Sequence, residues 1–164
     1  MFKIADLLDL EKTIAKTLFE GKNYPWEVLP DIKAYIYELG KALDPDKFYS
    51  PKEGVWIAKD AKVFESAYIG APCIIDSGTE VRHCAFIRGS AIVGKNCVVG
   101  NSVELKNVVL FDNVQVPHYN YVGDSVLGYK SHMGAGSITS NVKSDKTLVT
   151  VKAGEDRIET GMKK

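Results

Sequence analysis

Aliphatic residues recur at every sixth position through the middle of the chain, between Val55 and about Asn141. The clearest of these positions are Ile57, Val63, Ile69, Ile75, Val81, Ile87, Val93, Val99 and Leu105. A helix repeats about every 3.6 residues and a strand every two, so neither explains a sustained period of six. Small residues stand two positions before most of them, namely Ala61, Ala67, Cys73, Thr79, Ala85, Ala91 and Cys97. This double register is typical of the hexapeptide repeat of a parallel β-helix.

The repeat also predicts how the coils stack. Three hexads, about 18 residues, form one triangular coil, and successive coils lie about 4.8 Å apart through strand pairing. The step shortens by one position from Leu105 to Leu110 and again from Val122 to Leu127. The coil over 105–122 is therefore one residue shorter than a regular coil. Irregular coils are candidates for function, because strained backbone concentrates at functional sites.

The segment before the repeat is expected to be helical. Residues 4–20 have apolar positions at helical spacing and end at Gly21, and a second helix is predicted over roughly 28–42. Two short helices before a solenoid predict a cap over its open first coil. A substrate-binding arm is the functional alternative.

The period fails after Asn141. Alternating residues over 147–151 and 157–160 flank a turn at Gly154, which predicts a β-hairpin leaving the solenoid. We therefore expect a helical cap over 1–46, a β-helix over 47–144 and a hairpin extension over 145–164. A solenoid normally needs a terminal cap, so either the chain is a fragment or an oligomer partner covers this end.

Composition excludes several classes of function. The chain has 164 residues, 45% of them hydrophobic, with 21 basic and 21 acidic residues and a formal net charge of zero. This balance gives no long-range field that favours nucleic acid or an anionic membrane. There is neither an apolar run of about 18 residues nor a signal-peptide pattern, so a cytoplasmic location is expected.

The three cysteines are expected to be structural or inert. Cys73 and Cys97 occupy the small-residue position of their hexads, and Cys84 lies outside it. No C-x-x-C pair is present. Nothing near Cys84 indicates a nucleophile.

Two basic residues mark a possible anion site. Arg88 and Lys106 each follow an inward aliphatic residue and are three hexads apart, so we expect them to stack with Cα atoms about 5 Å apart. Stacked like charges repel unless an anion lies between them, and a phosphate would suit an Arg fork and a Lys point charge. The alternative is a solvated edge with the two side chains splayed apart.

A candidate acid–base group lies at the shortened coil. Glu104 and Tyr121 are one shortened coil apart and should stack, and His118 precedes Tyr121 at a corner. A histidine beside a carboxylate and a basic pair is a plausible general base. A surface histidine in a loop is the alternative.

A metal site is not expected. The chain has three histidines, His83, His118 and His132. Spacing allows the first two to share a face and places the third on another, and a catalytic zinc site needs three protein ligands.

Three motifs identify a resemblance. They are G-N-x-V-E-x-K over 100–106, H-x-x-Y-x-G-D over 118–124 and G-A-G-x-I-T-x-N over 134–141. Together they resemble the acetyltransferase domain of the bifunctional N-acetylglucosamine-1-phosphate uridyltransferase / glucosamine-1-phosphate acetyltransferase. The match runs without a gap over roughly 87–141. The resemblance implies a left-handed β-helix that assembles as a homotrimer with active sites between subunits.

The resemblance also implies roles for individual residues. His118 matches the base that takes a proton from the glucosamine amine as this attacks the thioester of acetyl-CoA, and Glu104 matches the group that orients it. The matches to substrate contacts are Arg88 and Lys106 for the sugar phosphate, with Tyr121 and Asn141.

The sequence departs from the family at three points. His132 replaces an asparagine that touches the sugar, Val142 replaces an aromatic residue, and a hairpin follows where the family has further coils that bind acetyl-CoA. The leading hypothesis is an acetyl-CoA-dependent acyltransferase acting on an amino-sugar phosphate. The alternatives are a sugar-phosphate or sugar-nucleotide binding module without catalysis, and a scaffold trimer.

Overall fold

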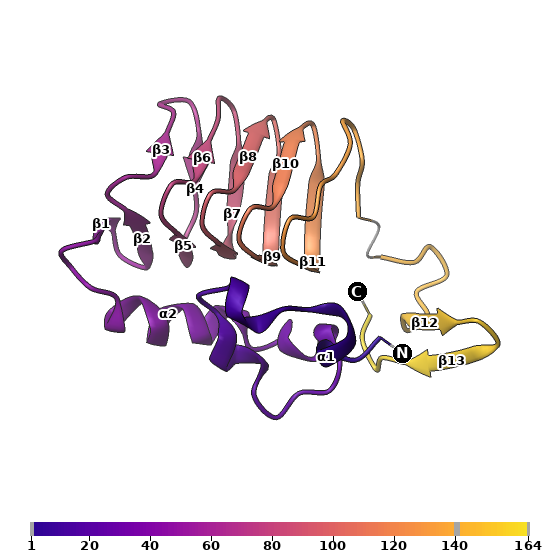
Figure 1. The fold of residues 1–164 in the computed structure, drawn as a ribbon. Coiled ribbons are helices and arrows are strands. Elements are labelled where there is room, and N and C mark those ends of the chain that lie inside the picture. Colours follow the sequence, from indigo (N-terminus) through magenta and orange to yellow (C-terminus); the bar gives the residue numbers. More distant parts are fainter. Residues whose placement is uncertain (1, 140–141, 164) are drawn as a thin grey trace.

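A stack of parallel β-coils forms most of the molecule in the computed structural model, which describes residues 2–139 and 142–163 (Figure 1). The coils follow one another in chain order, and helical segments from the N-terminus lie along one side of the stack (Figure 1). The predicted mainly β, left-handed parallel β-helix is confirmed.

Each coil contributes to three faces. Face one contains β2 (Val55–Ala58), β5 (Cys73–Ile75) and the second halves of β7 (Phe86–Val93), β9 (Glu104–Leu110) and β11 (Tyr121–Leu127). Face two contains β3 (Lys62–Val63), β6 (Glu80–Val81), β8 (Val98–Asn101) and β10 (Gln115–His118). Face three contains β4 (Tyr68–Ile69) and the first halves of β7, β9 and β11. The long strands therefore bend around one corner.

Strand register confirms the hexad reading. On face two, Val63 pairs with Val81 and Val81 with Val99, each one regular coil of three hexads further along the chain, and Val99 then pairs with Val116 across the shortened coil. These aliphatic side chains point inward, and Val81, Val99 and Val116 are fully buried. Cys73 and Cys97 are buried as well, and burial raises the pKa of each thiol to about 12. Both thiols are therefore inert at neutral pH.

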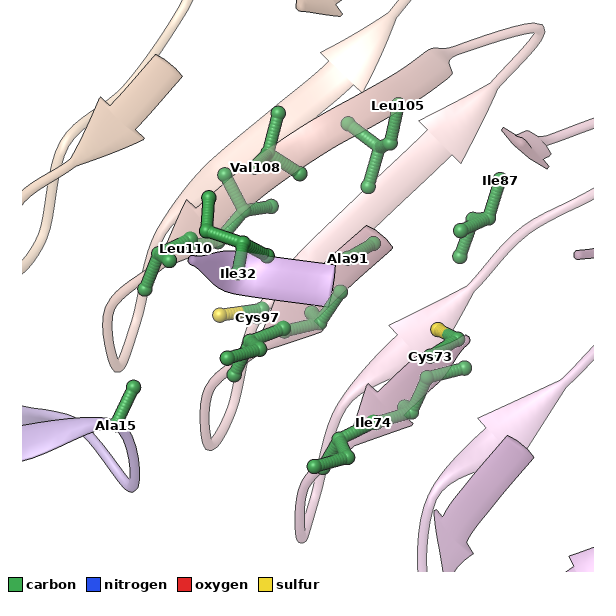
Figure 2. Close-up of a cluster of buried hydrophobic side chains, with 14 of the residues drawn as sticks. Ala15, Ile32, Cys73, Ile74, Ile87, Ala91, Cys97, Leu105, Val108 and Leu110 are labelled. Carbon is green, nitrogen blue, oxygen red and sulfur yellow. The ribbon is translucent and has the colours of Figure 1, made fainter. Parts of the chain in front are cut away.

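Face one is buried on both of its sides. Ile74, Ile92 and Val109 are register partners that point outward, yet all three are fully buried. They share one hydrophobic cluster with Ile32 and Ile36 of α2 (Ile32–Ala42), and Figure 2 shows Ile32 among the side chains of this cluster. Burial of the apolar side of α2 against the outward side chains of face one is the main force that holds the helix on the solenoid.

The helix does not lie where the sequence led us to expect. It runs along face one, against β5, β7 and β9, instead of covering the open first coil. At its C-terminal end Gly40 lies so close to the ring of Trp56 that a Cβ would collide with it. The edge of β2 is covered by β1 (Phe48–Lys52), which pairs with it in antiparallel fashion and leaves no open edge of β2 for another chain.

The predicted continuous helix over 4–20 is wrong. The segment forms α1 (Ile4–Leu7) and two 3₁₀ turns, η1 (Leu10–Lys12) and η2 (Lys16–Phe19). The side chain of Asp9 accepts a hydrogen bond from the Glu11 N–H at 3.0 Å, and Thr13 accepts one from the Ala15 N–H at 3.1 Å. Short polar side chains that bind nearby backbone in this way compete with helical hydrogen bonds.

The second helix is shorter than expected, and the hairpin is present. A 3₁₀ turn, η3 (Pro25–Val28), precedes α2, and Pro30 lies between them without an N–H to donate. After the last coil, β12 (Thr150–Ala153) and β13 (Asp156–Glu159) pair in antiparallel fashion as predicted.

Candidate functional site at the bulged coil

The shortened coil produces a bulge beside the predicted anion site. Ile87 pairs with Leu105, but the next pair is Gly89 with Lys106, so Arg88 has no partner in the register. The expectation that Arg88 and Lys106 stack in register is therefore wrong. β9 is one residue shorter than β7 directly after Leu105. The spacing of the aliphatic residues does not show at which position this residue is lost.

Each of the two cations has its own carboxylate partner. Arg88 Nη1 donates to Glu104 Oε1 at 2.9 Å, and this bond raises the pKa of the guanidinium. Lys106 Nζ donates to Asp124 Oδ2 at 2.8 Å, and Asn107 Nδ2 donates to the other oxygen of Asp124 at 2.8 Å. The Asp124 side chain is only 5% exposed, so this pair is well shielded from water. Repulsion between the two cations is thus relieved within the chain.

Arg88 and Lys106 nevertheless line one surface depression of about 440 Å³. Its other wall comes from the N-terminal segment and includes Leu29, Pro30 and Lys33. Lys33 is exposed at the start of α2, and its ammonium has no hydrogen-bond or ion-pair partner among residues 2–139 and 142–163. Three cations and one carboxylate therefore line the depression, a lining that favours an anion.

His118 lies at the corner between faces two and three, across face three from the depression, and buried Asn120 holds its backbone in place. Asn120 is 2% exposed, and its Oδ1 accepts from the His118 N–H at 3.2 Å. Its Nδ2 donates to the carbonyls of Gly134 at 2.8 Å and Ser137 at 3.0 Å in the next coil. The side chain of His118 is exposed, so the imidazole is presented to solvent from a corner whose hydrogen bonds are satisfied.

Tyr121 and Glu104 are register partners, as their spacing of one shortened coil predicts. The Tyr121 ring lies directly over the backbone of Gly123, where a Cβ would collide with the phenol. Gly123 in turn pairs with Lys106, so Tyr121 lies next to the depression that Lys106 lines. The predicted substrate contact Asn141 lies outside the described residues.

Within the described part of the chain no hydrogen bond joins the imidazole of His118 to the carboxylate of Glu104. The carboxylate instead binds Arg88, so its position in this structure is that of a partner of the guanidinium. The resemblance to the family alone did not indicate this pairing.

The other two histidines have local partners. His83 lies in the same column as His118, two coils away with Asn101 between them, and its Nδ1 is 3.1 Å from Ser66 Oγ. His132 Nδ1 is 3.3 Å from Gln115 Oε1, at the opposite end of β10 from His118. Among the described residues no group of three or more His, Cys, Asp or Glu side chains is arranged to hold a metal ion.

Three residues of this region were not predicted from the sequence. Lys33 comes from a helix far away in the chain, and no spacing connects it to Arg88. Asp124 and Asn120 are part of the H-x-x-Y-x-G-D motif, which places both beside His118 in sequence. Their burial could have been suspected because each follows a corner, where a buried amide or carboxylate can bind backbone from the neighbouring coil.

Comparison with known proteins identifies the family. The family model described as the GMPPB C-terminal domain matches residues 69–155, which is more than half of the chain. The chain belongs to the GMPPB C-terminal domain family. The matched residues include every coil that contributes to the site on the β-helix side, whereas Lys33 lies outside them.

Curated relatives of the chain agree with the resemblance seen in the sequence. The bifunctional protein GlmU of Nostoc sp. is 46% identical over 90 residues, 53% of this chain and 19% of the relative. A bifunctional sugar-1-phosphate nucleotidylyltransferase/acetyltransferase of Sulfurisphaera tokodaii is 31% identical over 146 residues, 85% of this chain and 36% of the relative. The chain thus spans between about a fifth and about a third of the length of these relatives.

A solved structure shares the fold of the chain. It is the acetyltransferase domain of PglB from Neisseria gonorrhoeae FA1090 in complex with acetyl coenzyme A. The TM-score is 0.52 at 17% identity, covering 73% of this chain and 65% of that chain. No helix among the described residues is long and apolar enough to cross a membrane.

Proposed function

We propose that this chain is an acyltransferase that moves an acetyl group from acetyl-CoA to the amine of an amino-sugar phosphate, with His118 as general base. One observation carries the proposal: an exposed histidine with a firmly held backbone lies at one end of face three, and a depression lined by three cations lies at the other end of that face. The similarity to the acetyltransferase domain of GlmU-like proteins supports this reaction class.

The depression is the proposed site of the sugar phosphate. A phosphate would take charge-assisted hydrogen bonds from Arg88, Lys106 and Lys33. Glu104 then positions the guanidinium of Arg88, and Asp124 positions the ammonium of Lys106. Tyr121, over Gly123, offers its phenol to the sugar ring.

The chemical step follows from this placement. The amine nitrogen attacks the carbonyl carbon of the acetyl thioester, and a C–N bond forms as the C–S bond breaks. Nε2 or Nδ1 of His118 takes the proton that the amine loses, and the coenzyme leaves as a thiolate that is protonated to the thiol. The amide product and the free thiol account for all atoms.

A binding module for a sugar phosphate is the second candidate. The same depression supports it, because anion binding needs Arg88, Lys106 and Lys33 but not His118. Separate titrations with glucosamine-1-phosphate and with coenzyme A distinguish the two proposals. Binding of the sugar phosphate without binding of the coenzyme favours the module, and binding of neither would favour a scaffold.

We further propose that three copies of the chain assemble with the site between subunits. Tyr68, Phe86 and Ile138 point outward on face three beside Glu104 and Tyr121, and they are 56%, 43% and 67% exposed. Apolar side chains that gather on one face favour contact with another protein surface. Light scattering during gel filtration tests the assembly, and a monomeric mass would exclude it.

The test of the function is release of free thiol from acetyl-CoA in the presence of glucosamine-1-phosphate. We expect His118→Asn to lower kcat by about 10² to 10⁴-fold with little change in the KM for the sugar phosphate. His83→Asn is the matched control, since it changes an exposed histidine of the same column. Equal activity of the two variants would show that His118 is not the base.

A further inference from the structure

A second hollow lies at the corner between faces one and two, apart from the site described above. Its volume is about 510 Å³, which suits a small organic molecule. One wall consists of residues that follow the strands of face one, and the other consists of the N-terminal segment and the start of β1. The lining residues are Glu11, Thr13, Ile14, Lys47, Phe48, Ala58, Lys59, Asp60, Asp76, Ser77, Lys95 and Asp112.

Asp76 is the unusual residue of this hollow. It is 2% exposed, and its Oδ1 accepts a hydrogen bond from the Ser77 N–H at 2.7 Å. Its Oδ2 has no hydrogen-bond partner within residues 2–139 and 142–163. A buried carboxylate oxygen nearly always has a partner, because leaving it without one costs the full desolvation penalty. Burial accordingly raises the pKa of this carboxyl.

The neighbouring carboxylates do not supply that partner. Asp60 Oδ2 accepts from Ser77 Oγ at 2.6 Å, and Asp112 Oδ1 accepts from the Lys95 N–H at 2.8 Å. The first bond holds Asp60 one coil before Asp76, and the second holds Asp112 two coils after it. The lining as a whole carries three lysines against four carboxylates, and one of these carboxylates, Glu11, is already paired with Lys16.

The rest of the lining indicates the shape of a ligand. Ile14, Phe48 and Ala58 form an apolar wall, and Phe48 offers an aromatic ring to a flat or aliphatic body. The described residues do not place three metal-ligating side chains together here, so a bare metal ion does not fit. A donor group that reached Oδ2 of Asp76 would bind an oxygen that is itself shielded from water, where a hydrogen bond to a charge is strong.

We propose that this hollow binds a small organic cation, an amine or amidine with an apolar body, whose N–H groups donate to Oδ2 of Asp76. The unsatisfied oxygen of Asp76 favours a hydrogen-bond donor, and the charge of its carboxylate favours a cationic one. The apolar wall of Ile14 and Phe48 favours an apolar body. The ligand would bridge the N-terminal segment and the β-helix. This site is independent of the acyl-transfer proposal.

The test uses benzamidine as the probe, with ¹⁵N-labelled full-length chain followed by NMR. We expect saturable shifts of the Ser77 and Lys95 amide signals with a Kd of about 1 mM or tighter. The isosteric anion benzoate should not bind, and neutral benzamide should bind at least about tenfold more weakly. These two comparisons use the unaltered protein, so they do not depend on the folding of any variant.

A variant then tests the role of the carboxylate. Asp76→Asn keeps the acceptor for Ser77 and removes the charge, and it should weaken benzamidine binding by about tenfold or more. Asp156→Asn, an exposed aspartate of β13, should leave binding unchanged. The proposal fails if Asp76→Asn binds as well as the unaltered chain, if benzoate binds equally, or if no binding occurs up to about 10 mM. It also fails if a crystal soaked in benzamidine shows only water at Asp76.

Discussion

Lys106 of β9 lies opposite Gly89 of β7, so Arg88, which precedes Gly89, has no register partner on β9. This one-residue offset directs Arg88 to Glu104, whereas Lys106 binds Asp124. Both cations still reach the same depression, where Lys33 of α2 joins them. The bulge therefore brings both cations to one depression without stacking them on each other, because a bulge can re-aim a side chain.

The bulge requires glycine at position 89. Gly89 has φ +123°, and a Cβ there would collide with the carbonyl of Ala71. We expect Gly89→Ala to lower the free energy of unfolding by about 2 to 3 kcal/mol, measured by urea denaturation. Gly154→Ala is the control, because φ is +65° there with no atom within 4 Å, and it should cost only about 1 kcal/mol. Equal losses would mean that Ala71 moves aside.

Two outward side chains of β7 should differ in their effect on stability. Ile92 is fully buried beneath α2, and Phe86 is 43% exposed on face three. Truncating Ile92 to Ala should cost about 2 to 5 kcal/mol, because it leaves a cavity under the helix. Phe86→Ala should cost about 1 kcal/mol, mainly through its ring contact with Tyr68. Thermal unfolding measures both, and similar losses would argue against a helix packed on face one.

Lys33 is expected to act on the phosphate alone. Lys33→Ala should raise the KM for glucosamine-1-phosphate about tenfold and leave the KM for acetyl-CoA and kcat unchanged. Lys41→Ala removes another lysine of the same helix that does not line the depression, and it should have no effect. If no turnover is detected, titration with inorganic phosphate still compares the two variants. If Lys33→Ala bound inorganic phosphate with unchanged affinity, Lys33 would not contribute to phosphate binding.

Asp76 should make stability depend on pH. Burial raises its pKa in the folded chain, with Asp112 and Asp60 adding to the effect and the Ser77 N–H and Lys95 opposing it. The folded chain therefore binds the proton of Asp76 more tightly than the unfolded chain does. The stabilisation from this proton is complete at a pH below the pKa of Asp76 in the unfolded chain, and it is lost as the pH rises through the pKa in the folded chain. We expect Asp76→Asn to be more stable than the unaltered chain at neutral pH and to show a flatter pH profile above about pH 4 in urea unfolding. If Asp76→Asn kept the original slope of unfolding free energy against pH, the pH dependence would come from another group.

The position of α2 could have been read from the sequence with one further comparison. Outward positions of face one are apolar in five successive coils: Trp56, Ile74, Ile92, Val109 and Val126. A solenoid face exposed to water would carry polar residues there, so this second apolar column indicates a covered face. The inward hexad positions alone did not distinguish a helix packed along one face of the solenoid from a helix over its first coil.

By itself, the sequence determined the β-helix, the pairing of Glu104 with Tyr121, the shortened coil and the buried cysteines. All of these follow from a fixed repeat. Residues that are one coil apart, 18 positions or 17 across the shortened coil, become neighbours when the coils stack. The tertiary structure alone decided which residue the bulge excludes, which carboxylate binds Arg88, and that Lys33 lines the same depression as Arg88 and Lys106. These outcomes depend on where a one-residue offset is absorbed and on the docking of a separate helix. Their energies are set by packing and charge between segments far apart in the chain, which no local pattern records.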